Sequence, residues 1–273
     1  MLPKALNHMT SPNMRYDDFM RMAKQLGCVG VHYRNDLIKP LFDGDSPEQV
    51  RQLAASLQMQ ITGLAQLERF NEWNAERAEQ AESLIQTAAA IGAVGVGLIP
   101  VNDGSGTADG ERQANLKAAL AELKPLLQAA GIKGFIEPLG FAQCSLRHKA
   151  EAVEAIEAVE GQGTFLLVHD TFHHFIANGG AIGAPIFPEY TGIIEISGVI
   201  DPNLGPLDMQ DKHRILVDAR DRIGNVNQIR ELQEAGYSGP VSFEPFSPEV
   251  HGLDNPAEAI AQSFDFIVSE LAA

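Results

Sequence analysis

Short apolar runs alternate with helical stripes along the whole chain, and this alternation restricts the fold more than any other feature. Such runs are typical of strands buried on both faces of a parallel sheet. Between them, apolar residues recur at helical spacing, and glycines such as Gly27, Gly92 and Gly131 follow the expected helices. The expected strands cover residues 5–9, 28–33, 61–65, 94–100, 132–138, 164–170, 193–197 and 241–245.

Eight strands alternating with helices over about 250 residues predict a single (β/α)8 barrel, the TIM-barrel fold of the α/β class. A doubly wound open sheet is the alternative, but no glycine-rich phosphate turn follows the first expected strand. No proline- or serine-rich linker divides the chain, so we expect one domain over residues 1–273. The connections at 174–190 and 200–222 are long, and long loops often carry substrate contacts.

The charge of the chain argues against nucleic acid as a partner. Asp and Glu number 36 against 20 Lys and Arg, which gives a formal net charge of −16. No apolar run reaches membrane-spanning length, and the N-terminus has no signal-peptide pattern. The two cysteines have no metal or redox spacing. We therefore expect a cytoplasmic protein that contacts no membrane.

In each of the last four expected strands an acid closes an apolar run. These residues are Glu137, Asp170, Glu195 and Glu244. A single acid in this place is commonly a helix cap. Because the carboxyl ends of barrel strands converge, however, four of them should share one cup and repel each other unless a cation or shared protons offset the charge. The sequence therefore predicts a divalent metal ion, Mn²⁺, Mg²⁺, Co²⁺ or Zn²⁺, and does not choose among them.

Further polar residues stand near the ends of the first three expected strands. His32 and Arg34 close the second strand, and Asn7 and Gln66 lie near the ends of the first and third. We expect them to face the same cup and bind substrate hydroxyls. Pairing of Arg34 with one of the many acids is the alternative.

Three segments make the chain resemble a known family. They read FIEPLGFAQC at 135–144, HDTFHH at 169–174 and VSFEPFSPE at 241–249. The chain resembles the xylose-isomerase-like TIM barrels, a family of sugar isomerases and epimerases that also contains endonuclease IV. Within the family it is most similar to the inosose isomerases, and the likeness runs over nearly the whole chain.

The resemblance implies a reaction and roles for the acids. Glu137, Asp170 and Glu244 match family metal ligands, whereas the usual histidine of the seventh strand is replaced by Glu195. The implied reaction moves a proton between adjacent carbons of a small polyhydroxy-ketone, an inosose or ketose, through an enediolate. Glu137 and Glu244 would be the catalytic acid and base. His173 would bind a substrate hydroxyl or orient Asp170, with an exposed loop histidine as the alternative.

The resemblance also suggests that Arg214 contacts substrate, although the Pro-Gly turn that usually follows this arginine is missing and a surface charge is the alternative. The expected partner is a small-molecule sugar or inosose, and the chain is compatible with a homo-oligomer. Two other functions stay open. An endonuclease IV-like metal hydrolase would need more histidines and a basic groove, and a catalytically inactive sugar-binding barrel would fit the replacement at Glu195.

Overall fold

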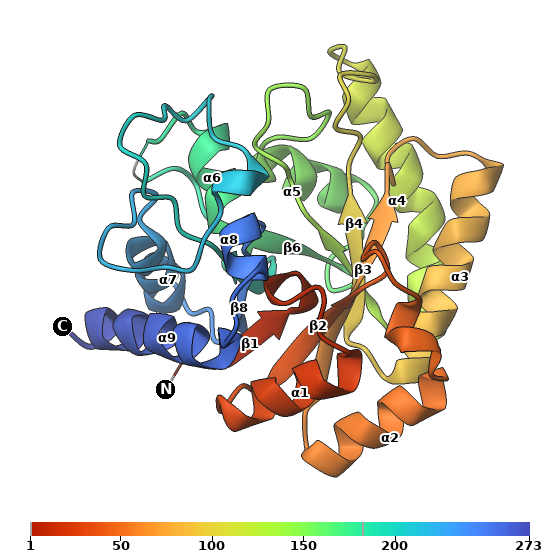
Figure 1. Ribbon diagram of the computed structural model, residues 1–273. Coiled ribbons are helices and arrows are strands. Elements are labelled where there is room, and N and C mark those ends of the chain that lie inside the picture. Colours follow the sequence, from red (N-terminus) through yellow and green to blue (C-terminus); the bar gives the residue numbers. More distant parts are fainter. Residues whose placement is uncertain (1, 182) are drawn as a thin grey trace.

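The computed structural model describes residues 2–181 and 183–273 and shows eight parallel strands closed into a barrel with helices around it (Figure 1). Neighbouring strands pair in chain order, and β8 closes the ring by pairing with β1. The predicted (β/α)8 barrel is confirmed. The strands are β1 (Lys4–Asn7), β2 (Gly30–Arg34), β3 (Gln60–Glu68), β4 (Gly95–Ile99), β5 (Lys133–Ile136), β6 (Phe165–Asp170), β7 (Thr191–Ile196) and β8 (Val241–Phe243).

The helices cover the outside of the barrel and bury their apolar stripes against it (Figure 1). Gly92 and Gly131 end α3 and α4 in the left-handed conformation, which glycine adopts without strain. None of the described helices combines the length and the apolar character that a bilayer crossing requires. The helices are α1 (Tyr16–Gln25), α2 (Pro47–Leu57), α3 (Ala75–Ile91), α4 (Glu111–Ala130), α5 (Lys149–Ala158), α6 (Thr171–Ala177), α7 (Asn225–Glu234), α8 (Pro248–His251) and α9 (Pro256–Ala272).

After β1 and after β6, the last residue of the strand caps the helical turn that follows it. β1 ends at Asn7, two residues earlier than predicted, and the Asn7 side chain accepts from the Met9 amide of a short 3-10 turn. Asp170 ends β6, and its Oδ1 accepts from the His173 amide at the start of α6. Both capping residues therefore stay at the rim of the barrel with their side chains fixed.

The two long connections follow β6 and β7, on the face where the strands end. α6 stops at Ala177, and the described residues up to β7 form turns and irregular structure. After β7 the chain runs through the short 3-10 helix Asp211–His213 before α7 begins. Beyond the end of α6, the described residues of 174–190 thus form a long connection, as expected. These loops stand over the carboxyl end of the barrel, where (β/α)8 barrels carry their sites (Figure 1).

Candidate active site

Four carboxylates meet at the carboxyl rim of the barrel. Glu137 and Glu244 directly follow β5 and β8, Asp170 ends β6, and Glu195 is the penultimate residue of β7, paired in register with Asp170. One oxygen atom from each of the four lies within 4.8 Å of the others. All four side chains are buried. The structure thus brings together the four acids that the strand ends predicted.

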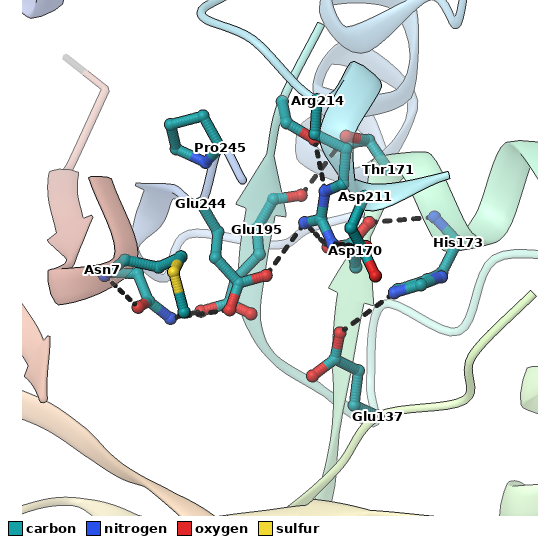
Figure 2. A network of polar contacts seen from close by, with 12 residues as sticks. Asn7, Glu137, Asp170, Thr171, His173, Glu195, Asp211, Arg214, Glu244 and Pro245 are labelled. Carbon is teal, nitrogen blue, oxygen red and sulfur yellow. Dashed lines mark hydrogen bonds and ion pairs between the residues drawn. The ribbon is translucent and has the colours of Figure 1, made fainter. Parts of the chain in front are cut away.

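Arg214 enters this cluster from the long loop after β7. Its side chain is 1 % exposed, so it is not the surface charge that the sequence left open. Nη2 donates to Asp170 Oδ2 and, at 2.9 Å, to Glu244 Oε2, as Figure 2 shows. Nε donates to Ser197 Oγ at 3.0 Å, and the guanidinium lies 4.5 Å from the centre of the Phe246 ring. Arg214 therefore supplies positive charge inside the acidic cup.

Glu244 is the most firmly held of the four acids. Besides Arg214, it accepts through Oε1 from Arg34 Nη1 at 2.6 Å and from Asn7 Nδ2 at 3.0 Å. Asn7 Nδ2 also donates to Glu195 Oε1 at 2.9 Å. Arg34 is fixed in turn by Asp36, which accepts from Nε and Nη2. Asn7 and Arg34 thus hold the carboxylates in place, and only Arg34 also lines the cavity above them.

His32 lies deeper in the barrel than we expected from its place in the sequence. The ring sits over Gly63, where a Cβ atom would come within 2.8 Å of His32 Nε2. Its Nδ1 is 3.4 Å from Glu195 Oε1, and the side chain is almost fully buried. Gln66, by contrast, lines the cavity, and its Oε1 accepts from Arg34 Nη2. His32 therefore lies against Glu195, with neither ring nitrogen hydrogen-bonded to the described residues, whereas Gln66 reaches the space where a ligand fits.

Glu137 differs from the other three acids because its carboxylate accepts no hydrogen bond from the described part of the chain. His173 Nε2 lies 3.8 Å from its Oε1 (Figure 2). His173 is buried in α6, not exposed on a loop, and its Nδ1 accepts from the Gly140 amide at 3.3 Å. Nε2 of the neutral ring therefore carries the proton and faces Glu137. Burial lowers the pKa of His173 to about 4, so the ring is neutral at neutral pH.

A cavity of about 410 Å³ opens above the acids. Glu137, His173, Arg214 and Glu244 are among the residues that line it. The volume lies in the range of small-molecule sites.

Several residues that line the cavity were not predicted from the sequence. One of them carried a usable signal: Phe246 lies two residues after Glu244, and alternate residues of an extended segment face the same side. The other lining residues that we did not predict include Asp36, Glu68, Arg69, Asn102, Asp103, Phe141 and Asp211.

Burial and the charges within the cluster shift the pKa values of its carboxylates. Burial, and after it the charges of the neighbouring carboxylates, raises the pKa of Glu137 and of Glu244 well above the usual value for a glutamate. Burial opposes the charge of Asp170 as well, but the Arg214 guanidinium, His173 with its backbone amide, and Lys149 together outweigh it and hold the pKa of Asp170 below its usual value. Glu137 and Glu244 are thus the acids that most need a further counter-charge.

The residues present fit a divalent cation. All four side chains offer hard oxygen donors, and the spacing of their oxygen atoms allows one ion to contact all of them. Among the described residues only two guanidinium groups, those of Arg34 and Arg214, form ion pairs with the four acids, and Arg34 is shared with Asp36, so negative charge is left over. Glu137 also has both carboxylate oxygens free of hydrogen bonds from the described residues. The donor set therefore suits Mg²⁺ or Mn²⁺, and Co²⁺ or Zn²⁺ less well.

Comparison with known proteins identifies the family of the chain. Residues 20–270 match the family described as the xylose isomerase-like TIM barrel. The chain belongs to this family. The matched region of this xylose isomerase-like barrel includes β5 to β8 and so all four carboxylates. The resemblance that we drew from residues 135–144, 169–174 and 241–249 is confirmed.

Individual members of the xylose isomerase-like family resemble the chain to different degrees. An inosose isomerase of Halalkalibacterium halodurans is 29 % identical over 191 residues, which cover 68 % of this chain and 65 % of that protein. The crystal structure of a xylose isomerase domain containing protein from Salmonella typhimurium LT2 has a TM-score of 0.90 at 28 % identity and covers 99 % of this chain and 97 % of that one. The IolI protein, solved with a zinc atom, has a TM-score of 0.84 at 20 % identity, covers 99 % of this chain and 98 % of that one, and so shares the fold.

The raised pKa values predict a stability that depends on pH and on metal together. In the folded protein the pKa of Glu137 and Glu244 exceeds the unfolded value of about 4.3. Their stabilising contribution is therefore complete below that value and is lost as the pH rises through the raised pKa. A bound cation would offset the charge that appears, so we expect the rise in Tm caused by Mn²⁺ to grow with pH and to vanish in acid.

Thermal unfolding at a series of pH values, with a chelator or with Mn²⁺, measures this effect. Glu137→Gln is the control, because it removes one of the two titrations and should flatten the pH dependence of the chelated protein. A rise in Tm with Mn²⁺ that is the same near pH 4 and near pH 8 would mean that these carboxylates do not hold the ion.

Proposed function

We propose that the chain is a cytoplasmic, metal-dependent isomerase or epimerase of a small polyhydroxy-ketone, an inosose or a ketose. The observation that carries the proposal is the cluster of four buried carboxylates with the unbonded Glu137 facing a cavity of about 410 Å³. Membership of the xylose isomerase-like family and the similarity to an inosose isomerase support this class of reaction.

The charges around the cavity favour a neutral substrate. Each arginine that lines it is paired with acids: Arg34 with Asp36 and Glu244, and Arg69 with Glu72 and Asp103. Arg214 likewise forms ion pairs with Asp170, Asp211 and Glu244. Among the described lining residues no arginine is thus left unpaired to receive a phosphate or carboxylate group. Carboxylates and amides instead accept from and donate to hydroxyl groups, which suits an unphosphorylated polyol.

The side chains of the cup have distinct tasks in the proposed reaction. A divalent cation held by Glu137, Asp170, Glu195 and Glu244 would act as a Lewis acid toward the substrate carbonyl. Glu137 lines the cavity and its carboxylate accepts no hydrogen bond from the described residues, so it is free to take the proton from the neighbouring carbon. Glu244, which faces the cup from a different side in Figure 2, returns a proton from a position fixed by Arg34 and Arg214.

A sugar-binding barrel without catalysis is the second candidate, because Arg214 already bridges Asp170 and Glu244 and supplies counter-charge there. An endonuclease IV-like hydrolase is disfavoured, since the net charge is −16 and acids outnumber arginines around the cavity. The two favoured candidates differ in whether a bound sugar exchanges its proton.

Proton exchange in D₂O tests the proposal. Purified protein, loaded with Mn²⁺, Mg²⁺, Co²⁺ or Zn²⁺ in turn, is incubated with a panel of inososes and ketoses and followed by NMR. We expect deuterium at the carbon next to the carbonyl of one neutral substrate, an isomeric product, and loss of both with a chelator. Saturable binding without exchange would establish the inactive barrel, and exchange that persists without metal would contradict the metal requirement.

Glu195 gives a prediction about metal choice, because it stands where the family resemblance implies a histidine. Glu195→Gln keeps the shape of the side chain but removes its charge, so we expect weaker metal binding and lower turnover. Glu195→His introduces a softer nitrogen donor and should shift the preference toward Zn²⁺ or Co²⁺. Titration of each variant with the four metals measures the effect, and Glu122→Gln, on the exposed face of α4, is the control. Unchanged metal affinity in both Glu195 variants would show that Glu195 is not a ligand.

A further inference from the structure

A second cavity, of about 220 Å³, is lined by the segments that follow β5 and β6. The same two segments also line the first cavity. Glu137 and His173 line the first, and their neighbours Pro138 and His174 line the second. The described residues that line the second cavity include no acid, although the chain as a whole carries a net charge of −16. Its basic lining residues are Arg147, His148, Lys149 and His174.

Lys149 is the most informative of these residues. It is the first residue of α5 and is only 7 % exposed. Its Nζ lies 2.9 Å from His174 Nδ1, and among the described residues no carboxylate lies within 4.0 Å of it. A buried ammonium without a counter-ion is unfavourable. Burial accordingly lowers the pKa of Lys149 to about 7, with only the more distant Asp170 and Glu137 acting against it. Two of its three N–H donors remain for a ligand.

Arg147 and His148 add donors beside Lys149. Arg147 Nε and Nη2 both donate to the Gly140 carbonyl oxygen, at 3.2 and 3.0 Å, which fixes the plane of the guanidinium. Its Nη1 has no acceptor among the described residues. The His148 side chain makes no hydrogen bond in the described part of the chain, and both residues face the same cavity. Three basic side chains with free donors thus surround one small space.

We propose that this second cavity binds a small oxyanion of the phosphate type, held by Lys149 and Arg147. An anion there supplies the counter-charge that the buried ammonium lacks, through charge-assisted hydrogen bonds. The cavity volume admits inorganic phosphate or the phosphate group of a small ester. This site is separate from the acidic cup, whose arginines are already paired with carboxylates. It therefore does not depend on the proposed isomerase function.

Calorimetric titration of the metal-free protein with inorganic phosphate tests the site, with sodium chloride at matched ionic strength as the blank. We expect saturable binding of one phosphate with a Kd on the order of 1 mM or tighter. Lys149→Met should weaken it at least about tenfold. Arg147→Gln, which leaves the buried lysine in place and serves if Lys149→Met does not fold, should weaken it by a smaller factor. The control is Lys117→Met, which removes a partly exposed lysine of α4 that pairs with Glu154 and does not line the cavity.

A second titration with glycerol phosphate distinguishes the source of the oxyanion. Tighter binding of the ester than of inorganic phosphate would identify a phosphorylated metabolite as the ligand, and the reverse order would identify the free ion. Absence of saturable phosphate binding to the wild-type protein would overturn the proposal. Wild-type affinity in both Lys149→Met and Arg147→Gln would overturn it as well, because phosphate would then bind elsewhere.

Discussion

Replacement of Glu137 by glutamine is expected to lower kcat by a factor on the order of 10²–10⁴, which is the usual contribution of a positioned acid or base. The same variant should unfold at the same temperature as the wild type or at a higher one. Glu137 accepts no hydrogen bond from the described residues, and its charge is disfavoured by burial and by the other carboxylates. Removing that charge therefore relieves repulsion without breaking a contact.

The rate of deuterium exchange and the melting temperature, measured on the same preparation, check both parts of this prediction. Glu122→Gln removes a carboxylate from the exposed face of α4 and should change neither quantity. If Glu137→Gln keeps more than about a tenth of the wild-type kcat, the proton is taken by another group. A large fall in melting temperature would instead mean that Glu137 has a structural role that the hydrogen bonds do not reveal.

Replacement of Arg214 by methionine is expected to destabilise the fold by about 3–5 kcal/mol, the usual effect of removing one partner of a buried ion pair. Methionine roughly keeps the length of the side chain but leaves Asp170 and Glu244 without the guanidinium that bridges them. Asp170 is 1 % exposed and does not line the cavity, so its buried charge loses its ion-pair partner, whereas Glu244 keeps Arg34. Chemical denaturation of wild type and variant in the presence of a chelator measures the difference.

Arg220 offers a matched control in the same loop. It is bound to Asp218 through three hydrogen bonds, but its side chain is 68 % exposed, so Arg220→Met should leave the denaturation midpoint unchanged. Mn²⁺ should restore part of the stability that Arg214→Met loses, because an ion in the cup supplies the missing positive charge. If Arg214→Met denatures at the same midpoint as the wild type, the bridge contributes nothing to the fold.

The sequence predicts the barrel and the four acids for the same reason. Strand ends converge in a parallel barrel, so residues far apart in the chain, such as Glu137 and Glu244, can be placed together from strand order alone. Arg214 could not be placed in this way. It lies in a long loop without periodicity, and the same sequence would suit a surface arginine.

The sequence also does not predict how deep a side chain lies within the barrel. Asn7 and His32 belong to strands whose residues line the barrel in layers, and the sequence does not tell which layer meets the ligand. The structure buries both against the carboxylates and outside the cavity lining, and Asn7 donates to Glu195 and Glu244. Lys149 shows the same limit: the run from Arg147 to Lys149 resembles a basic surface cluster, and only the packing of His174 against it reveals a buried ammonium.

The carboxylate of Asp170 contacts both the acidic cluster at the barrel rim and the first turn of α6. One carboxylate oxygen accepts from Arg214, and the other accepts from the backbone amide of His173 in the first turn of α6. A change of charge or ligation on the first oxygen alters the electron density on the second, because both belong to one delocalised group. The His173 amide is therefore a built-in reporter. Its nitrogen and proton chemical shifts, followed by NMR without any added label at the cavity, would register each ion or proton that arrives at the acids.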